Sequence, residues 1–126
     1  MEKTKLFSNA PIGVFDSGLG GLTVLKSLEK MLPKESFIYF GDTAHVPYGT
    51  KSTNTVLKYS KNIIEFFLSK KTKAIVIACN TASAVAFNEL QGQYTIPLFD
   101  VVTPSVELAI KESKTKYIGV IGTTST

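Results

Sequence analysis

The chain has 126 residues, of which 44% are hydrophobic and 19% charged, so it can form one compact core and is not disordered as a whole. It has no apolar run near the roughly 18–20 residues that span a bilayer, and residues 1–10 lack the apolar stretch of a secretory signal. We therefore expect no membrane partner. The formal net charge is +4, but all 14 basic residues are lysines. Because arginine supplies forked contacts to phosphate and guanine, this composition argues against nucleic-acid binding.

Cys79 is the single cysteine of the chain. It cannot form an intramolecular disulfide, and it indicates a reducing, cytoplasmic compartment. Because free cysteine is often a small buried hydrophobe, the residue type alone does not separate a packing role from a chemical one.

Short apolar runs alternate with segments of helical periodicity along the chain. The uninterrupted apolar runs, separated by amphipathic helices, are typical of a parallel sheet covered on both faces. We therefore predict an α/β fold, a parallel-sheet domain with three layers (αβα). In chain order the pattern predicts a strand at 12–15, a helix at 22–32, a strand at 37–40, a long helix that begins at Ser52 or Thr53, a strand at 74–78, a helix at 82–90, a strand at 96–102, a helix from Pro104 to about Ser113 and a strand at 117–121.

Polar residues follow three of the predicted strands. They are Asp16-Ser17, Asp42 and Cys79-Asn80-Thr81. Ligands of open parallel sheets bind outside the carboxyl ends of the strands. If the strands are adjacent, these residues share one edge of the sheet, which predicts a site there.

The first of these loops, residues 16–21, is rich in glycine and opens a helix, a pattern typical of anion binding. It also matches the dinucleotide-binding fingerprint in part, with Gly18 and Gly20 in place but Thr23 at the third glycine position. Asp42 could then bind a ribose, yet Asp16 would place a negative charge beside the pyrophosphate. A nicotinamide-dependent oxidoreductase is therefore a minor alternative.

The other two loops leave alternatives open as well. Residues 41–49 form a long connection, as binding loops often do, although Asp42 could simply cap a turn. His45, the only histidine, is expected to be an ordinary exposed residue. Cys79 precedes a helix, whose N-terminus stabilises a thiolate. A Cys/His/Asn hydrolase using His45 is a further alternative.

Four segments together, residues 16–21 (DSGLGG), 41–49 (GD with VPYG), 78–82 (ACNTA) and 121–123 (IGT), resemble the bacterial glutamate racemases of the aspartate/glutamate racemase superfamily. The resemblance implies a cofactor-independent isomerase that interconverts L- and D-glutamate for peptidoglycan synthesis, and hence for cell-wall biogenesis and cell shape. No metal is expected, because no set of Cys, His and carboxylate residues shows metal-ligand spacing. The resemblance implies Cys79 as a catalytic base and Asp16 as its helper. By the same resemblance, substrate contacts are implied for Asp16, Ser17, Tyr48, Gly49, Asn80 and Thr81.

The resemblance also implies two similar α/β domains with the site between them. Residues 1–98 would be the first domain, with 1–10 as an N-terminal extension, and 99–126 the truncated start of the second. Residues 100–104 (DVVTP) depart from the family pattern before the proline.

The family's second base is a cysteine in a Cys-Thr-His motif that this sequence lacks. We expect the chain alone to be inactive or impaired, and its uncovered apolar faces to favour a homo-oligomer. The alternatives are a racemase of aspartate or another amino acid, or a non-catalytic carboxylate-binding module.

Overall fold

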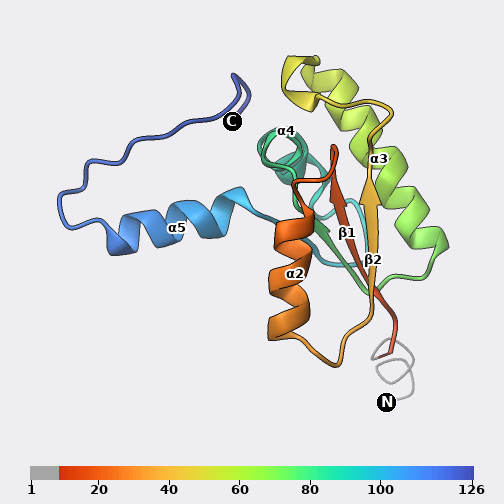
Figure 1. The fold of residues 1–126 in the computed structure, drawn as a ribbon. Helices are drawn as coiled ribbons and strands as arrows, with labels where there is room; N and C mark the ends of the chain where they lie inside the picture. The colour runs from red at the N-terminus through yellow and green to blue at the C-terminus, as the bar shows by residue number, and fades with distance from the viewer. Residues whose placement is uncertain (1–8) are drawn as a thin grey trace.

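The computed structural model describes residues 9–126, which form a single parallel sheet flanked by helices (Figure 1). The N-terminal extension expected at residues 1–10 lies outside the described residues except for its last two. Within the described part, no helix is long and apolar enough to cross a membrane. In chain order the elements are β1 (Ile12–Asp16), α2 (Leu22–Met31), β2 (Phe37–Gly41), the short 3-10 helix η1 (Tyr48–Thr50), α3 (Thr53–Ser69), β3 (Ala74–Ile77), α4 (Asn80–Leu90), β4 (Leu98–Asp100) and α5 (Val102–Glu112).

The strands lie in the order β2-β1-β3-β4, and each neighbouring pair is parallel. The predicted α/β fold is therefore confirmed. β1 pairs on one side with β2 and on the other with β3, so the chain reverses its direction of winding between β1 and β3. In open parallel sheets this switch point is where ligands bind.

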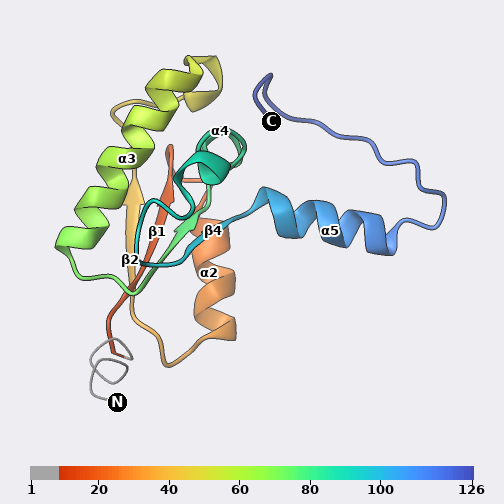
Figure 2. The same cartoon turned by 180° about the vertical axis from the view of Figure 1, so that it is seen from behind.

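The alternating side chains of the strands divide the core into two parts. On one face, Phe15, Ile75 and Ile77 pack with α3 and α4. On the other face, Val14 and Val76 pack with the apolar residues of α2. The helices on the two sides of the sheet are seen in Figure 1 and, from behind, in Figure 2, which agrees with the predicted three layers.

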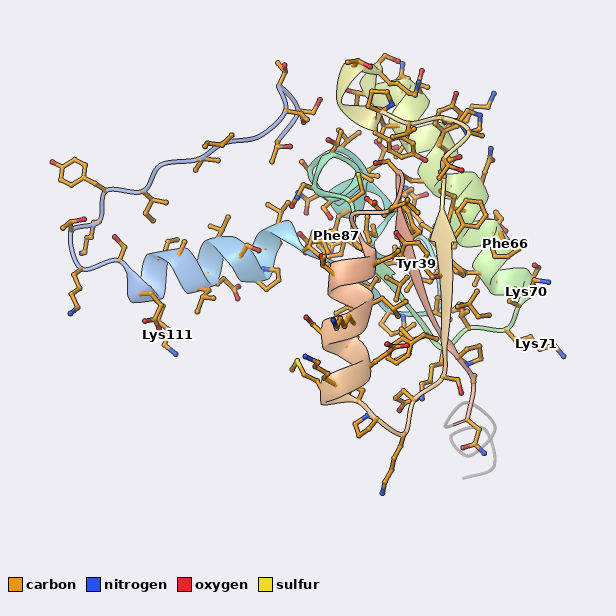
Figure 3. The ribbon with its side chains drawn as sticks, in the orientation of Figure 1. Tyr39, Phe66, Lys70, Lys71, Phe87 and Lys111 are labelled. Carbon is orange, nitrogen blue, oxygen red and sulfur yellow. The ribbon has the colours of Figure 1, made fainter. Side chains whose placement is uncertain are left out.

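Three of the lysines lie at or just after the C-terminal ends of helices α3 and α5. Lys70 and Lys71 follow α3, and Lys111 lies in the last turn of α5 (Figure 3). The Nζ of Lys70 lies 5.4 Å from the centroid of the Phe66 ring. Positive charge near a helix C-terminus complements the helix dipole, which accounts for these positions without an anionic partner.

Helix boundaries follow side chains that accept hydrogen bonds from the first turn. Ser52 caps α3, accepting from the backbone N–H of Thr55 at 3.2 Å, as one of the two predicted caps. Helix α4 begins at Asn80, two residues earlier than predicted, because Cys79 takes the cap position. Asp100 accepts from the N–H groups of Val102 and Thr103 and so starts α5.

The prediction of a strand at 117–121 is wrong. Residues 113–126 form no regular helix or strand, and Tyr117 is 91% exposed. A strand needs a neighbour to satisfy its backbone, and no sheet edge of the described residues lies beside this segment. In Figure 1, α5 and this segment extend away from the sheet before the C-terminus returns toward α4.

The strand predicted at 96–102 is shorter than expected, because only Leu98–Asp100 pairs with β3. β4 therefore spans the boundary expected between residues 98 and 99. The division into two domains at that point stays a prediction.

Candidate active site

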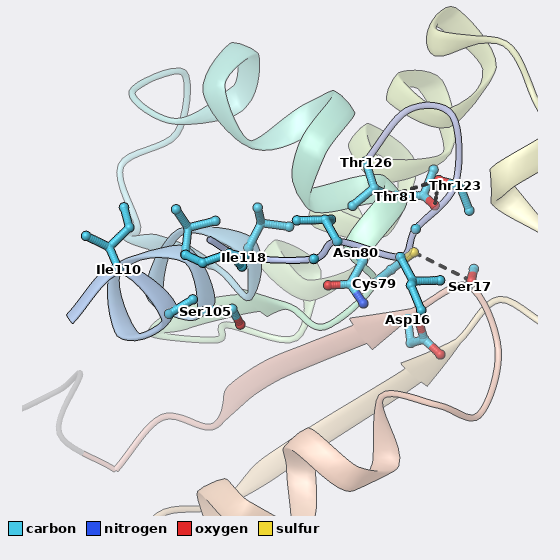
Figure 4. A pocket seen from close by; sticks show the side chains of 17 residues that line it. Asp16, Ser17, Cys79, Asn80, Thr81, Ser105, Ile110, Ile118, Thr123 and Thr126 are labelled. Atoms are coloured by element: carbon cyan, nitrogen blue, oxygen red, sulfur yellow. Dashed lines mark hydrogen bonds between the residues drawn. The ribbon is translucent and has the colours of Figure 1, made fainter. Parts of the chain in front are cut away.

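A cavity of about 730 Å³ lies at the carboxyl ends of β1 and β3 (Figure 4). One wall consists of Asp16, Ser17, Cys79, Asn80 and Thr81. The opposite wall is mainly apolar and comes from α5 and the segment that follows it. Apart from the segment at 121–123, sequence reasoning missed this second wall, because its other residues belong to no motif and only the path of the chain through and after α5 brings them to the site.

Strand pairing explains why the loops after β1 and β3 meet. Phe15 is in register with Ile77, and the N–H of Ala78 donates to the carbonyl of Phe15 at 2.8 Å. Asp16, the last residue of β1, and Cys79, the second residue after β3, therefore emerge side by side. The structure therefore brings Asp16 and Cys79 together at the carboxyl edge of the sheet, where the sequence predicted a site.

Cys79 is 6% exposed and occupies the N-cap of α4. Its Sγ accepts from the N–H of Ala82 at 3.4 Å, and its thiol donates to Ser17 Oγ at 3.6 Å. The Ala82 N–H and the Ser17 hydroxyl are therefore the polar neighbours that fix the position of the sulfur. The sulfur also borders the cavity, so it can accept a proton from a molecule bound there.

Asp16, only 7% exposed, is held by the loop that follows it. Its Oδ2 accepts from the N–H of Gly18 at 3.2 Å and from that of Gly21 at 3.0 Å. These donors precede α2, where a dinucleotide fold would hold its pyrophosphate. Because the carboxylate of the protein already occupies them, the geometry argues against the nicotinamide alternative.

Asn80 and Thr81 form the first turn of α4. Asn80 is exposed at the cavity, and the Thr81 hydroxyl lies 3.0 Å from that of Thr123. Thr123 in turn lies 2.9 Å from the Thr126 hydroxyl. Sequence reasoning singled out Thr123 only as part of a motif, and its contact with Thr81 brings it into the site.

Tyr48 and Gly49 do not line the cavity in this structure. Tyr48 is 1% exposed and donates its hydroxyl to Asp42 Oδ2 at 2.6 Å. Gly49 lies behind Thr123, since a Cβ added at Gly49 would come within 2.5 Å of the Thr123 Cγ2. Both residues therefore lie one layer behind the wall of the cavity.

His45 belongs to a separate cluster. It is exposed, as expected, but its Nδ1 lies 2.8 Å from Asp42 Oδ1, and its ring stacks on Tyr59 with 4.1 Å between centroids. These three residues border a different cavity of about 110 Å³. His45 is thus not in the cavity that Cys79 borders, which argues against the Cys/His/Asn hydrolase.

Comparisons with known proteins agree on one family. A family model described as Asp/Glu/Hydantoin racemase matches residues 12–126. A curated glutamate racemase from Aquifex aeolicus is 50% identical over 115 residues, which cover 91% of this chain and 45% of the relative. The chain thus spans a little under half the length of that protein.

Solved structures of glutamate racemases have the same fold. One isoform from Bacillus anthracis matches with a TM-score of 0.89 and 44% identity, over 92% of this chain and 44% of that one. A glutamate racemase from Francisella tularensis, solved in complex with D-glutamate, matches with a TM-score of 0.75 and 51% identity, over 79% of this chain and 38% of that one.

Proposed function

Because the chain belongs to the Asp/Glu/hydantoin racemase family, we propose that it is the N-terminal part of a glutamate racemase and supplies one of the two bases that exchange the α-proton of glutamate. The proposal rests on the environment of Cys79. Its sulfur caps α4, contacts Ser17 and borders a cavity that Asp16, Asn80 and Thr81 share. A carbon acid needs such a combination, a polarisable base beside fixed hydrogen-bond donors.

In the proposed reaction, the Cys79 thiolate takes the α-proton of D-glutamate. The electron pair of the broken C–H bond moves into the α-carboxylate, and a proton delivered to the opposite face gives L-glutamate. Microscopic reversibility requires a second base on that face, which accepts the proton in the reverse direction. Cys79 is the single cysteine of this chain, so no other cysteine of these 126 residues can be that base.

The groups beside Cys79 suit the charges of this reaction. The Asn80 amide, the Thr81 hydroxyl and the N-terminus of α4 can stabilise the negative charge that develops on the substrate carboxylate. The buried Asp16 carboxylate is available to pair with the substrate ammonium group. A site built from amide, hydroxyl and backbone donors can hold a dicarboxylate without arginine.

We assign Tyr48 and Gly49 to substrate contact on the family resemblance. Thr123 lies against Gly49 and also contacts Thr81. A substrate carboxylate would therefore reach Gly49 only after Thr123 moves aside.

The direct test is exchange of the α-proton of D-glutamate in heavy water, followed by the loss of its proton NMR signal. We expect slow exchange by the wild-type chain and none by Cys79→Ser, because the alcohol is far too weak an acid to supply a base near neutral pH. Exchange that persists in Cys79→Ser would refute the proposed base.

Asp16 has a matched control in Asp100, since each carboxylate accepts two backbone N–H groups near a helix start. Asp16→Asn should slow exchange by about 10²-fold or more, the lower range of acid–base contributions. Asp100→Asn should retain the exchange rate, because Asp100 does not line the cavity. Equal losses in the two variants would indicate a structural effect only.

The same assay separates the alternatives. Binding of glutamate without exchange would favour a non-catalytic carboxylate-binding module. Faster exchange of aspartate than of glutamate would favour an aspartate racemase.

We further propose a cytoplasmic enzyme that supplies D-glutamate for peptidoglycan and that self-associates. Large apolar side chains on α5 and after it support self-association, since Leu108, Ile110, Val120 and Ile121 are all exposed. Sedimentation velocity should show a species heavier than one chain of 126 residues, and a strict monomer at micromolar concentration would contradict self-association.

A further inference from the structure

Tyr39 connects β2 to the loop that follows β1. It lies in the middle of β2 on the face covered by α2 (Figure 3). Its hydroxyl donates to the carbonyl oxygen of Gly18 at 2.9 Å. Gly18 immediately follows Ser17, whose hydroxyl lies 3.6 Å from the Cys79 sulfur.

Close packing confines the Gly18 peptide. A Cβ added at Gly41 would lie 2.5 Å from the Gly18 carbonyl oxygen, so β2 approaches that oxygen at contact distance. The N–H of Gly18 donates to Asp16. Both polar backbone groups of Gly18 therefore have a fixed partner, one from Asp16 and one from Tyr39.

The Tyr39 hydroxyl also lies next to the charged part of the site. A Cβ added at Gly21 would lie 3.1 Å from this hydroxyl and 2.7 Å from the Asp16 Cβ. Burial raises the pKa of Tyr39, and the charges of Asp16 and Cys79 raise it further. The phenol therefore stays protonated and remains a hydrogen-bond donor over the whole neutral range.

We propose that Tyr39 is a positioning residue for Cys79, holding the Ser17 hydroxyl against the sulfur through its hydrogen bond to the Gly18 carbonyl. The catalytic consequence rests on the proposed function, whereas the geometric consequence for the thiol does not. Without the bond, the peptide between Gly18 and Leu19 loses its partner, and the Gly18 backbone is held only by its N–H bond to Asp16. The Ser17 hydroxyl then spends less time within reach of the sulfur, and a thiolate at Cys79 loses a donor.

Tyr39→Phe removes the hydroxyl and keeps the ring, and Tyr94→Phe is a matched control. Tyr94 is also partly buried, and burial together with the charge of Glu65 and a hydrogen bond to it raises its pKa, but Glu65 lies on α3. The readout is the rate at which iodoacetamide alkylates Cys79 at pH 7. We expect Tyr39→Phe to slow alkylation about fivefold, the effect of one ordinary hydrogen bond. Tyr94→Phe should react at the wild-type rate.

A double-mutant cycle with Ser17→Ala separates positioning from general loosening of the fold. If Tyr39 acts through Ser17, Tyr39→Phe should have little further effect in the Ser17→Ala background. Additive effects would overturn the proposal, as would a wild-type alkylation rate in Tyr39→Phe. Urea unfolding of each variant verifies that the alkylated protein is folded.

The exchange assay tests the catalytic consequence separately. We expect Tyr39→Phe to lower kcat for α-proton exchange about fivefold with KM nearly unchanged, since the positioned group is the base and not the binding wall. If the wild-type chain showed no exchange, the proposed function would fail, and the alkylation cycle would still decide the role of Tyr39.

Discussion

Removal of the Tyr48 hydroxyl is a sharp test of how the loop before α3 is held. Tyr48 is 1% exposed and donates at 2.6 Å to Asp42, which is itself 7% exposed. In Tyr48→Phe, the buried Asp42 carboxylate keeps its hydrogen bond with His45 but loses the shorter one from the Tyr48 hydroxyl. Hydrogen bonds to charged groups contribute about 1.5–3 kcal/mol, so we expect the free energy of unfolding to fall by about that amount at pH 7.

Urea unfolding at pH 7 measures this loss. The control is Tyr117→Phe, because Tyr117 is 91% exposed, and its free energy of unfolding should stay within about 0.5 kcal/mol of wild type. A loss below about 0.5 kcal/mol in Tyr48→Phe would refute the reasoning, since the buried carboxylate would then not depend on this donor.

The pH dependence gives a second readout of the same bond. Burial raises the pKa of Tyr48 above its ordinary value of 10.0, and the hydrogen bond to Asp42 and its charge raise it further. Above about pH 10 the unfolded chain releases this proton while the folded chain keeps it, so unfolding becomes more favourable as pH rises. The stability advantage of wild type over Tyr48→Phe should be full below about pH 10 and shrink above it. An advantage that stays constant in urea titrations up to about pH 11 would contradict this assignment.

Two further changes test packing. Gly41→Ala should destabilise the fold by about 1–3 kcal/mol, because the new Cβ would lie 2.5 Å from the Gly18 carbonyl oxygen, a backbone atom that cannot move aside cheaply. Gly119→Ala is its control, since nothing lies within 4 Å of that position, and equal urea midpoints for the two variants would contradict the contact. Ser60 is fully buried, and its hydroxyl has no partner among the described residues, so Ser60→Ala should raise the free energy of unfolding by about 1 kcal/mol. A clearly lower melting temperature of Ser60→Ala than of wild type would contradict this and indicate that the hydroxyl has a hydrogen-bond partner.

The apolar pattern predicted most of the elements because each can be recognised locally. Runs such as β3 are apolar throughout, and helices such as α3 carry their apolar residues at helical spacing. The segment at 117–121 has the same apolar character as β3, but a strand also requires a partner that supplies backbone hydrogen bonds. Local pattern cannot reveal whether that partner is present.

The placement of Tyr48 shows the same limit at the level of the site. The motif that contains it indicated a binding loop, and the loop does lie near the carboxyl edge of the sheet. The Tyr48 ring is nevertheless turned into the core toward Asp42, and Gly49 is covered by Thr123. The contact between Gly49 and Thr123 joins two distant parts of the chain, so no spacing rule could have predicted it.

The sequence by itself determined which residues end the strands, and hence that Asp16, Ser17 and Cys79 would lie at the carboxyl edge of a parallel sheet. The order of the strands decided that these residues meet, because only the pairing of β1 with β3 places the two loops side by side. Tertiary structure also decided that Tyr39 reaches the Gly18 carbonyl from β2. The physical reason is that strand propensity and capping are local properties, whereas the distance between two loops depends on every pairing and packing contact between them.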